Sequence, residues 1–141
     1  MPPRASGRML RRTISESAHF AALSPEAAVL FVMLIPHFNA HGKMPGGPGW
    51  IKDEVVPLIP YLDYGSIPGL LREISGSTNF KWFKVGPKWW IHALDFHDHQ
   101  ELRSDRMGDD DLPSWPGEEA GAEGVAQDTG NIELRENSGR T

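Results

Sequence analysis

The sequence predicts an α+β domain that is mainly helical and carries a small β-hairpin. Three observations support this expectation. A long apolar run follows a strong helix-start signal, two shorter helical patterns come after it, and two strand-like runs separated by Gly86-Pro87 follow them. The 141 residues are enough for one domain and a tail.

The first predicted elements are helices. A short helix is expected at residues 15–22, with Ser15 or Ser17 as its cap. A longer helix at residues 24–38 begins with Ser-Pro-Glu, because serine accepts a hydrogen bond from a free N–H, proline is tolerated at the first helical position, and glutamate favours the positive end of the helix dipole. We expect Pro36 to distort its last turn. Its apolar side chains on all sides mark it as central and buried.

A short strand and two further helices are predicted next. Residues 41–44 are long enough for a strand, after which glycines and prolines break regular structure. A second helix is expected at 50–59, ended by Pro57 and Pro60. A third is expected at 66–74, where four apolar side chains share one face, and Gly76 is expected to close it.

Two strands and a polar tail complete the prediction. The strands are expected at 80–85 and 88–94, with Gly86-Pro87 as their turn. We expect Trp82 and either Trp89 or Trp90 to pack this hairpin onto the central helix. From residue 108 onward Gly, Glu, Asp and Ser dominate and apolar residues are sparse, which predicts disorder.

The predicted order of elements is that of a winged helix-turn-helix. Two helices joined by a short turn precede a β-hairpin, and in such a domain the later helix enters a DNA groove while the hairpin is the wing. The expected organisation is therefore a flexible basic arm at 1–12, a winged helix-turn-helix domain at 13–107 and a disordered acidic tail at 108–141.

The charges of the chain are segregated, although the net charge is -5. Residues 1–107 hold 12 lysines and arginines and 10 aspartates and glutamates, a net charge of +2. Residues 108–141 hold 2 and 9, a net charge of -7. The folded part is mildly basic, as suits a polyanionic partner, and we expect the acidic tail to compete weakly with DNA for it.

Several segments resemble a known family. The stretches "LIPH", "HGKMPGGPGWIK", "HQELRSDR" and "LPSWP", together with the hairpin, are similar to the winged-helix N-terminal domains of bacteriophage replication initiators, or replisome organisers. The resemblance covers about residues 8–116. It implies DNA binding in phage replication initiation, by origin recognition or replisome assembly. Phe96 stands where tryptophan is usual, and the third helix contains Pro68 and Gly69.

We expect no enzyme activity, cofactor or metal. The glycines of "GKMPGGPG" do not have the spacing of a phosphate-binding loop, and no nucleophile motif or paired carboxylates are found. His92, His97 and His99 are a conceivable zinc set, but a zinc site needs ligands that converge on one point about 2 Å away. Surface and capping roles explain these histidines better.

Contacts with DNA are expected from three places. Lysines on the hairpin can neutralise phosphates, an exposed ring beside them can stack on a base, and an arginine on the third helix can read a guanine. The alternative for the hairpin lysines is a solvated edge that resists aggregation. The expected residues are Arg8, Arg11 and Arg12 of the arm, Lys52 and Arg72 of the helix-turn-helix, and Lys81, Lys84 and Lys88 of the wing.

Two other functions stay open at this point. A winged helix can dock helicase-loading proteins of the host or the phage without binding DNA, and a phage transcriptional regulator is a further alternative. Self-association is also left open. The lack of cysteines fits a reducing cytoplasm, and the longest apolar run, 27–35, is too short to span a membrane, so we expect a cytoplasmic protein without a signal peptide.

Overall fold

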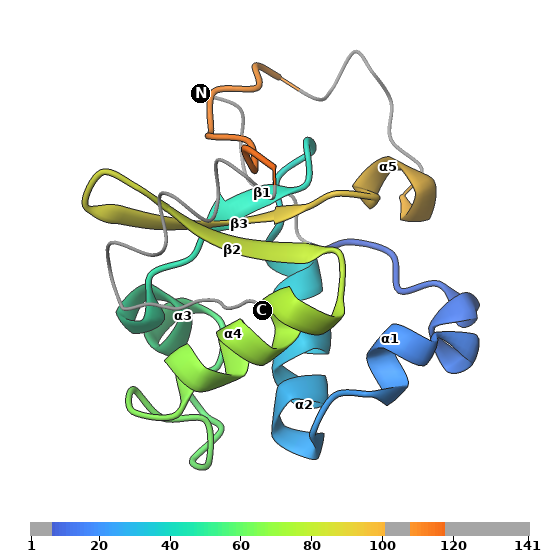
Figure 1. Cartoon of the computed structure of the whole chain (residues 1–141), viewed down its shortest axis with the longest axis vertical. Helices are drawn as coiled ribbons and strands as arrows, with labels where there is room; N and C mark the ends of the chain where they lie inside the picture. The colour runs from blue at the N-terminus through green and yellow to red at the C-terminus, as the bar shows by residue number, and fades with distance from the viewer. Residues whose placement is uncertain (1–6, 101–107, 118–141) are drawn as a thin grey trace.

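The computed structural model describes residues 7–100 and 108–117. It confirms the predicted α+β class, because helices pack against one face of a small antiparallel sheet (Figure 1). Within the described residues, no helix is long and apolar enough to cross a membrane. The elements are η1 (Arg12–Glu16, a 3-10 helix), α1 (Ala18–Ala21), α2 (Pro25–Leu34), η2 (Ile35–His37, a 3-10 helix), β1 (Lys43–Pro45), α3 (Pro48–Glu54), α4 (Ile67–Ser77), β2 (Phe80–Val85), β3 (Lys88–Ala93) and α5 (Phe96–His99).

Helix α2 is the centre of the domain and begins as predicted. Ser24 caps it, with Oγ accepting a hydrogen bond from the N–H of Ala27 at 3.3 Å. The same hydroxyl donates to a carboxylate oxygen of Glu73 on α4 at 2.9 Å, so the cap also joins two helices. The expected distortion at Pro36 is confirmed, because the α-helix gives way to the 3-10 helix η2 there.

The sheet contains the hairpin and the short strand β1. Its strand order is β1-β3-β2, and both pairs are antiparallel. The register pairs Trp82 with Ile91 and Phe83 with Trp90. Because successive side chains alternate between the two faces, Trp82 and Ile91 point to the helices while Phe83 and Trp90 point away from them. Trp82 is buried, as predicted, and its indole N–H donates to the carbonyl of Gly46 at 2.8 Å.

A continuous series of phenylalanine rings joins the N-terminal segment, residues 7–20, to this core. Phe31 of α2 contacts Phe20 at 5.5 Å between ring centroids and stacks on Phe80 at 4.1 Å. Phe38 then contacts Phe80 at 4.9 Å and Phe96 at 5.8 Å. The five rings come from α1, α2, the end of η2, β2 and α5, so they hold together elements that are distant in the sequence.

Two predicted helix ends are wrong. Helix α3 ends at Glu54 rather than 59, because the chain turns at Val55 and Val56, whose N–H groups both bond to the carbonyl of Ile51 before Pro57. Helix α4 runs through Gly76 to Ser77. It stops at Thr78, where the backbone becomes extended.

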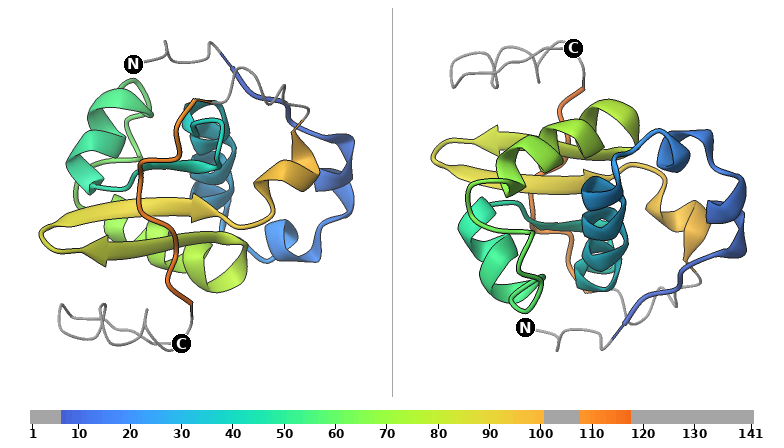
Figure 2. Two further views of the ribbon diagram at one scale, coloured as in Figure 1. Left: turned by 90° about the horizontal axis from the view of Figure 1, so that it is seen from above. Right: turned by 90° about the horizontal axis from the view of Figure 1, so that it is seen from below.

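The predicted disorder from residue 108 is wrong for residues 108–117. This part, which we call the covering segment, crosses the strands on the sheet face turned away from the helices (Figure 2, left). Trp115 contacts the ring of Phe83 at 5.8 Å and leaves only 1% of Phe83 exposed. One aromatic ring and several polar contacts hold the segment, although its composition is that of a tail. Residues 118–141 of the predicted tail, and residues 1–6 of the predicted arm, lie outside the described residues.

Two glycines provide a matched test of this packing. Gly42 has a positive φ of 76°, and a Cβ there would lie 2.5 Å from Cβ of Phe96. We expect Gly42→Ala to lower the free energy of unfolding by about 1–3 kcal/mol. Gly76 lies in α4, where an added Cβ would meet no atom within 4 Å. We expect Gly76→Ala to raise that free energy by about 0.5–1 kcal/mol. Urea denaturation of both variants measures the difference, and equal stabilities would contradict the packing at Gly42.

Candidate nucleic-acid interface

The eight basic residues expected to contact DNA fall into three groups. Three lie on α4 and the hairpin, two turn inward to backbone carbonyls, and three lie in the N-terminal segment. The first group is Arg72, Lys84 and Lys88. The second group, whose side chains turn inward, is Lys52 and Lys81. The third group is Arg8, Arg11 and Arg12.

The first group is organised by two stacked indole rings. Trp82 and Trp89 are parallel within 18°, with 4.0 Å between ring centroids. The guanidinium carbon of Arg72 lies 5.8 Å from the centroid of Trp82, and Nζ of Lys84 lies 5.5 Å from that of Trp89. Each cation–π contact contributes about 0.5–1 kcal/mol at an exposed position. The rings therefore limit where the two cations lie.

The strand register explains this arrangement. Lys84 pairs directly with Trp89, and Trp82 lies two residues before Lys84 on the same sheet face. Helix α4 packs beneath β2, which brings exposed Arg72 to Trp82 (Figure 1). Lys88 is exposed beside the Gly86 turn, at the tip of the hairpin. Arg72 and Lys84 therefore lie on the helix-facing side of the hairpin, whereas Lys88, which pairs with Val85, lies at the tip on the other face.

The second group stabilises the ends of two helices. Nζ of Lys52 donates to the carbonyls of Val56 and Ile59, at 3.0 and 2.9 Å. Nζ of Lys81 donates to the carbonyl of Ser75, in the last turn of α4, at 3.0 Å. A lysine near a helix C-terminus satisfies carbonyls that have no partner within the helix. Contact with a phosphate would compete with these bonds.

The N-terminal segment lies on the opposite side of the molecule from the hairpin tip (Figures 1 and 2). Nε of Arg8 donates to the carbonyl of Phe38 at 3.1 Å, and its guanidinium lies over the ring of Phe96. Burial lowers the pKa of Arg8 below its usual value. Arg11 contacts the sulfur of Met9, and Arg12 is exposed. These arginines are therefore not neighbours of Arg72 and Lys84.

Exposed acidic residues adjoin the group of cations around Arg72. These acidic residues lie at the end of α3 and in the α3–α4 loop, residues 55–66. Asp53, Glu54 and Asp63 are exposed there. The backbone N–H of Ser66 donates to Asp63 at 2.8 Å and lowers the pKa of that carboxyl. Negative charge at this end of the helix pair opposes contact with phosphates, so a DNA surface would be confined to the middle of α4 and the hairpin.

The other face of the sheet holds a buried lysine that the sequence did not single out. Lys43 is 4% exposed, and its ammonium donates to three oxygens of the covering segment. These are a carboxylate oxygen of Asp110 at 2.7 Å, the hydroxyl of Ser114 at 2.7 Å and the carbonyl of Leu112 at 3.2 Å. The hydrogen bond from Lys43 lowers the pKa of Asp110. A tryptophan within an otherwise acidic stretch was the available signal for this contact.

The histidines of the conceivable zinc set have separate surroundings. Nδ1 of His92 accepts a hydrogen bond from the backbone N–H of Trp115 at 3.0 Å, whereas His97 is exposed on α5. The side chain of His99 lies outside the described residues. In the part of the chain that is described, no three histidine, aspartate or glutamate side chains are grouped so that they can hold a metal ion.

Comparison of the chain with models of protein families, with curated proteins and with solved structures found no match in any of the three.

The contact between His92 and Trp115 has an expected pH dependence. Nδ1 can accept the N–H only while it is unprotonated, and burial, followed by the charge of Lys43, lowers the pKa of His92 below its ordinary 6.5. The contribution of His92 to holding the covering segment is therefore complete above pH 6.5 and is lost as the pH falls from there towards the lowered pKa. We expect the Trp115 amide to lose protection from hydrogen exchange over this range.

His92→Gln is the matched control, because a glutamine oxygen can accept the same hydrogen bond without titrating. Comparing the two chains at each pH removes the intrinsic pH dependence of exchange. If protection of the Trp115 amide falls equally in the variant and in the natural sequence, the titration of His92 is not the cause.

Proposed function

We propose that α2, β1, α3, α4 and the β2–β3 hairpin form a winged helix that binds DNA, with α4 at a groove and the hairpin as its wing. The order of these elements and the strand order β1-β3-β2 support the proposal. The α3–α4 connection of residues 55–66 is longer than the usual turn of three or four residues. The comparison with a helix-turn-helix therefore concerns the order of the elements rather than the turn.

The observation that carries the proposal is the set of cations along α4 and the hairpin. Stacked tryptophans hold Arg72 and Lys84 on the helix-facing side of the hairpin. Lys88 adds a cation at the hairpin tip, on the other sheet face. Within the described residues, Arg72 and Lys88 form no ion pair. Such side chains can neutralise phosphates at little cost to the folded structure.

Binding of this kind would depend more on the DNA backbone than on sequence. Arg72 is the only long hydrogen-bond donor on the exposed side of α4, between exposed Gly69 and Gly76. One arginine can read one guanine, whereas the lysines act on phosphates. The resemblance to phage replication initiators makes origin binding or replisome assembly the proposed biological setting.

A protein-docking winged helix is the second candidate function. The acidic residues Asp53, Glu54 and Asp63 favour it, as does the use of Lys52 and Lys81 in internal hydrogen bonds. A helicase-loading protein with a basic surface would suit the acidic end of the helix pair. Salt-dependent DNA binding separates the two candidates.

Substitutions on the DNA surface should have different signatures. We expect Lys84→Ala and Lys88→Ala each to weaken binding to all DNA sequences and to lower the slope of log affinity against log salt by about one. Arg72→Ala should also remove about 1–3 kcal/mol of discrimination at one base pair if it reads a guanine. Salt-titrated fluorescence anisotropy with several duplexes measures both effects.

Lys52→Ala is the matched control for these variants. Because the Lys52 ammonium is bonded to two carbonyls, its loss should lower stability and leave the salt slope unchanged. Should the natural sequence show no salt-dependent affinity for DNA, the docking function replaces DNA binding.

The acidic C-terminal residues are expected to weaken DNA binding by competition. A chain that ends at residue 117 keeps the covering segment. The residues that it lacks carry six acidic side chains and two arginines, so their net charge is -4. We expect this chain to bind DNA more tightly than the full chain at low salt. The difference should shrink as screening shortens the Debye length from about 30 Å at 0.01 M to about 10 Å at 0.1 M. Equal affinities at the lowest salt would exclude competition.

A further inference from the structure

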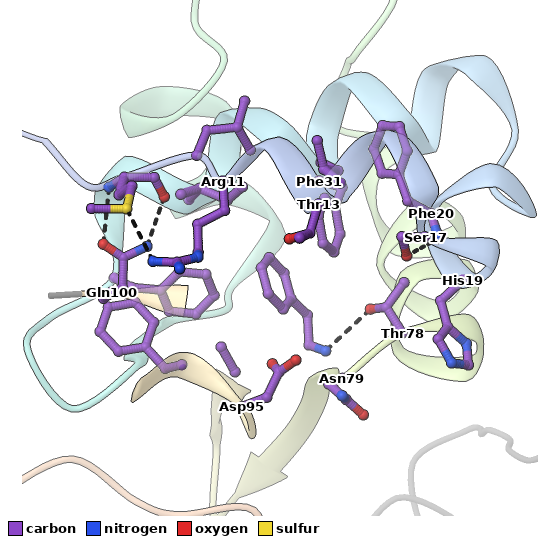
Figure 3. Close-up of a pocket in the computed structure, with 18 residues that line it drawn as sticks. Arg11, Thr13, Ser17, His19, Phe20, Phe31, Thr78, Asn79, Asp95 and Gln100 are labelled. Atoms are coloured by element: carbon purple, nitrogen blue, oxygen red, sulfur yellow. Dashed lines mark hydrogen bonds between the residues drawn. The ribbon is translucent and has the colours of Figure 1, made fainter. Parts of the chain in front are cut away.

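An apolar cavity of about 150 Å³ lies between the N-terminal segment and the sheet. Rings line much of it, and Figure 3 shows Phe20 and Phe31 beside it, with Arg11 and Asp95 reaching it from different elements. Protein interiors are close-packed, and the walls of an unfilled space lack contacts on one side. An apolar group that enters this cavity would supply those contacts. Its ring lining is Phe20, Phe31, Phe38, Phe80 and Phe96.

The α3–α4 loop lies away from the N-terminal segment, on the other side of the molecule (Figures 1 and 2), and it carries an exposed apolar side chain. Leu58 is 90% exposed and lies between Pro57 and Pro60. The loop beneath it is fixed by the bonds of Lys52 to two carbonyls and by the hydrogen bond from the hydroxyl of Tyr64 to Asp53. The exposure of Leu58 therefore belongs to an ordered loop, and the prolines reduce the entropy lost on binding.

The two surfaces are complementary in charge. Residues 53–65 contain three acids and no lysine, arginine or histidine. The N-terminal segment, residues 7–20, contains three arginines and one glutamate. Asp95 adds a negative charge to the cavity lining, where Arg11 and His19 also lie. An acidic, apolar loop would therefore meet a segment of net positive charge at one wall of the cavity if one molecule presents its loop to the cavity of another.

We propose that the chain self-associates head to tail, with Leu58 of one copy inserted into the phenylalanine-lined cavity of the next. The occupant is a second copy because this chain itself carries both the protruding leucine and an apolar cavity, and the segment beside that cavity has the opposite charge to the loop that carries the leucine. Since the two surfaces differ, each dimer keeps one free loop and one free cavity, so the contact continues into longer oligomers or closes into a ring. The proposal does not depend on DNA binding.

Sedimentation of the full chain over a concentration series tests this contact. We expect reversible association, weakened about tenfold or more in Leu58→Asp, because a fully buried leucine contributes about that much to an equilibrium. Thr13→Trp should weaken association similarly, since Thr13 is exposed at the cavity and a large ring there blocks the entrance. Val85→Asp, at another exposed apolar residue, should change nothing and serves as the control.

Mixing the two blocked chains gives the decisive result. The Leu58→Asp chain keeps its cavity and the Thr13→Trp chain keeps its leucine, so an equal mixture should form heterodimers that cannot extend, at concentrations where each chain alone is monomeric. The proposal is overturned if the natural chain stays monomeric up to about 1 mM, if the mixture stays monomeric, or if Val85→Asp weakens association as much as Leu58→Asp does. Unchanged thermal unfolding of each variant confirms that the folds are intact.

Discussion

Helix α2 carries apolar side chains on every side, and the remaining elements are arranged to cover it. Its buried residues Ala27, Leu30 and Leu34 belong to the common core with α4 and the sheet. A further side of α2 is covered by the N-terminal segment and by β2, because Phe31 contacts the ring of Phe20 and stacks on that of Phe80. An all-apolar helix can be stable only when several elements surround it, so its burial sets the positions of α4, the sheet and the segment that precedes it. The phenylalanine-lined cavity lies where the N-terminal segment leaves part of α2 and of the sheet uncovered.

The sheet has a similar requirement on its outer face. Phe83 and Lys43 both point away from the helices. Phe83 does not suit a face open to solvent, and Lys43 does not suit a face covered by apolar groups alone. Burying an ammonium group is unfavourable unless hydrogen-bond acceptors and a counter-charge come with it. The covering segment supplies both, because Trp115 packs on Phe83 while Asp110, Leu112 and Ser114 accept bonds from Lys43. Its aspartate is thus a structural partner as well as part of an acidic tail.

Local signals predicted the elements better than their contacts. The cap at Ser24, the turn at Gly86-Pro87 and the alternation around Trp82 depend on neighbouring residues, and the structure agrees with each. The positions of charged side chains depend on distant backbone. Lys52 bonds to carbonyls of a loop whose path no local pattern indicates. The covering segment was missed for the same reason, since its few apolar residues become sufficient only against Phe83.

Two surfaces of opposite charge lie near helix α4. Arg72 and Lys84 contact the stacked tryptophans where α4 meets the hairpin, and Asp63 lies in the acidic loop that precedes α4. A polyanion would therefore be drawn to the middle of α4 and the hairpin, and a basic protein surface to the acidic loop. The proposed DNA surface and the proposed self-association loop share no residue, so both contacts can be made by one molecule. Binding at one surface can still influence the other through charge, because the two surfaces lie in one small domain, and this influence would decrease as salt increases.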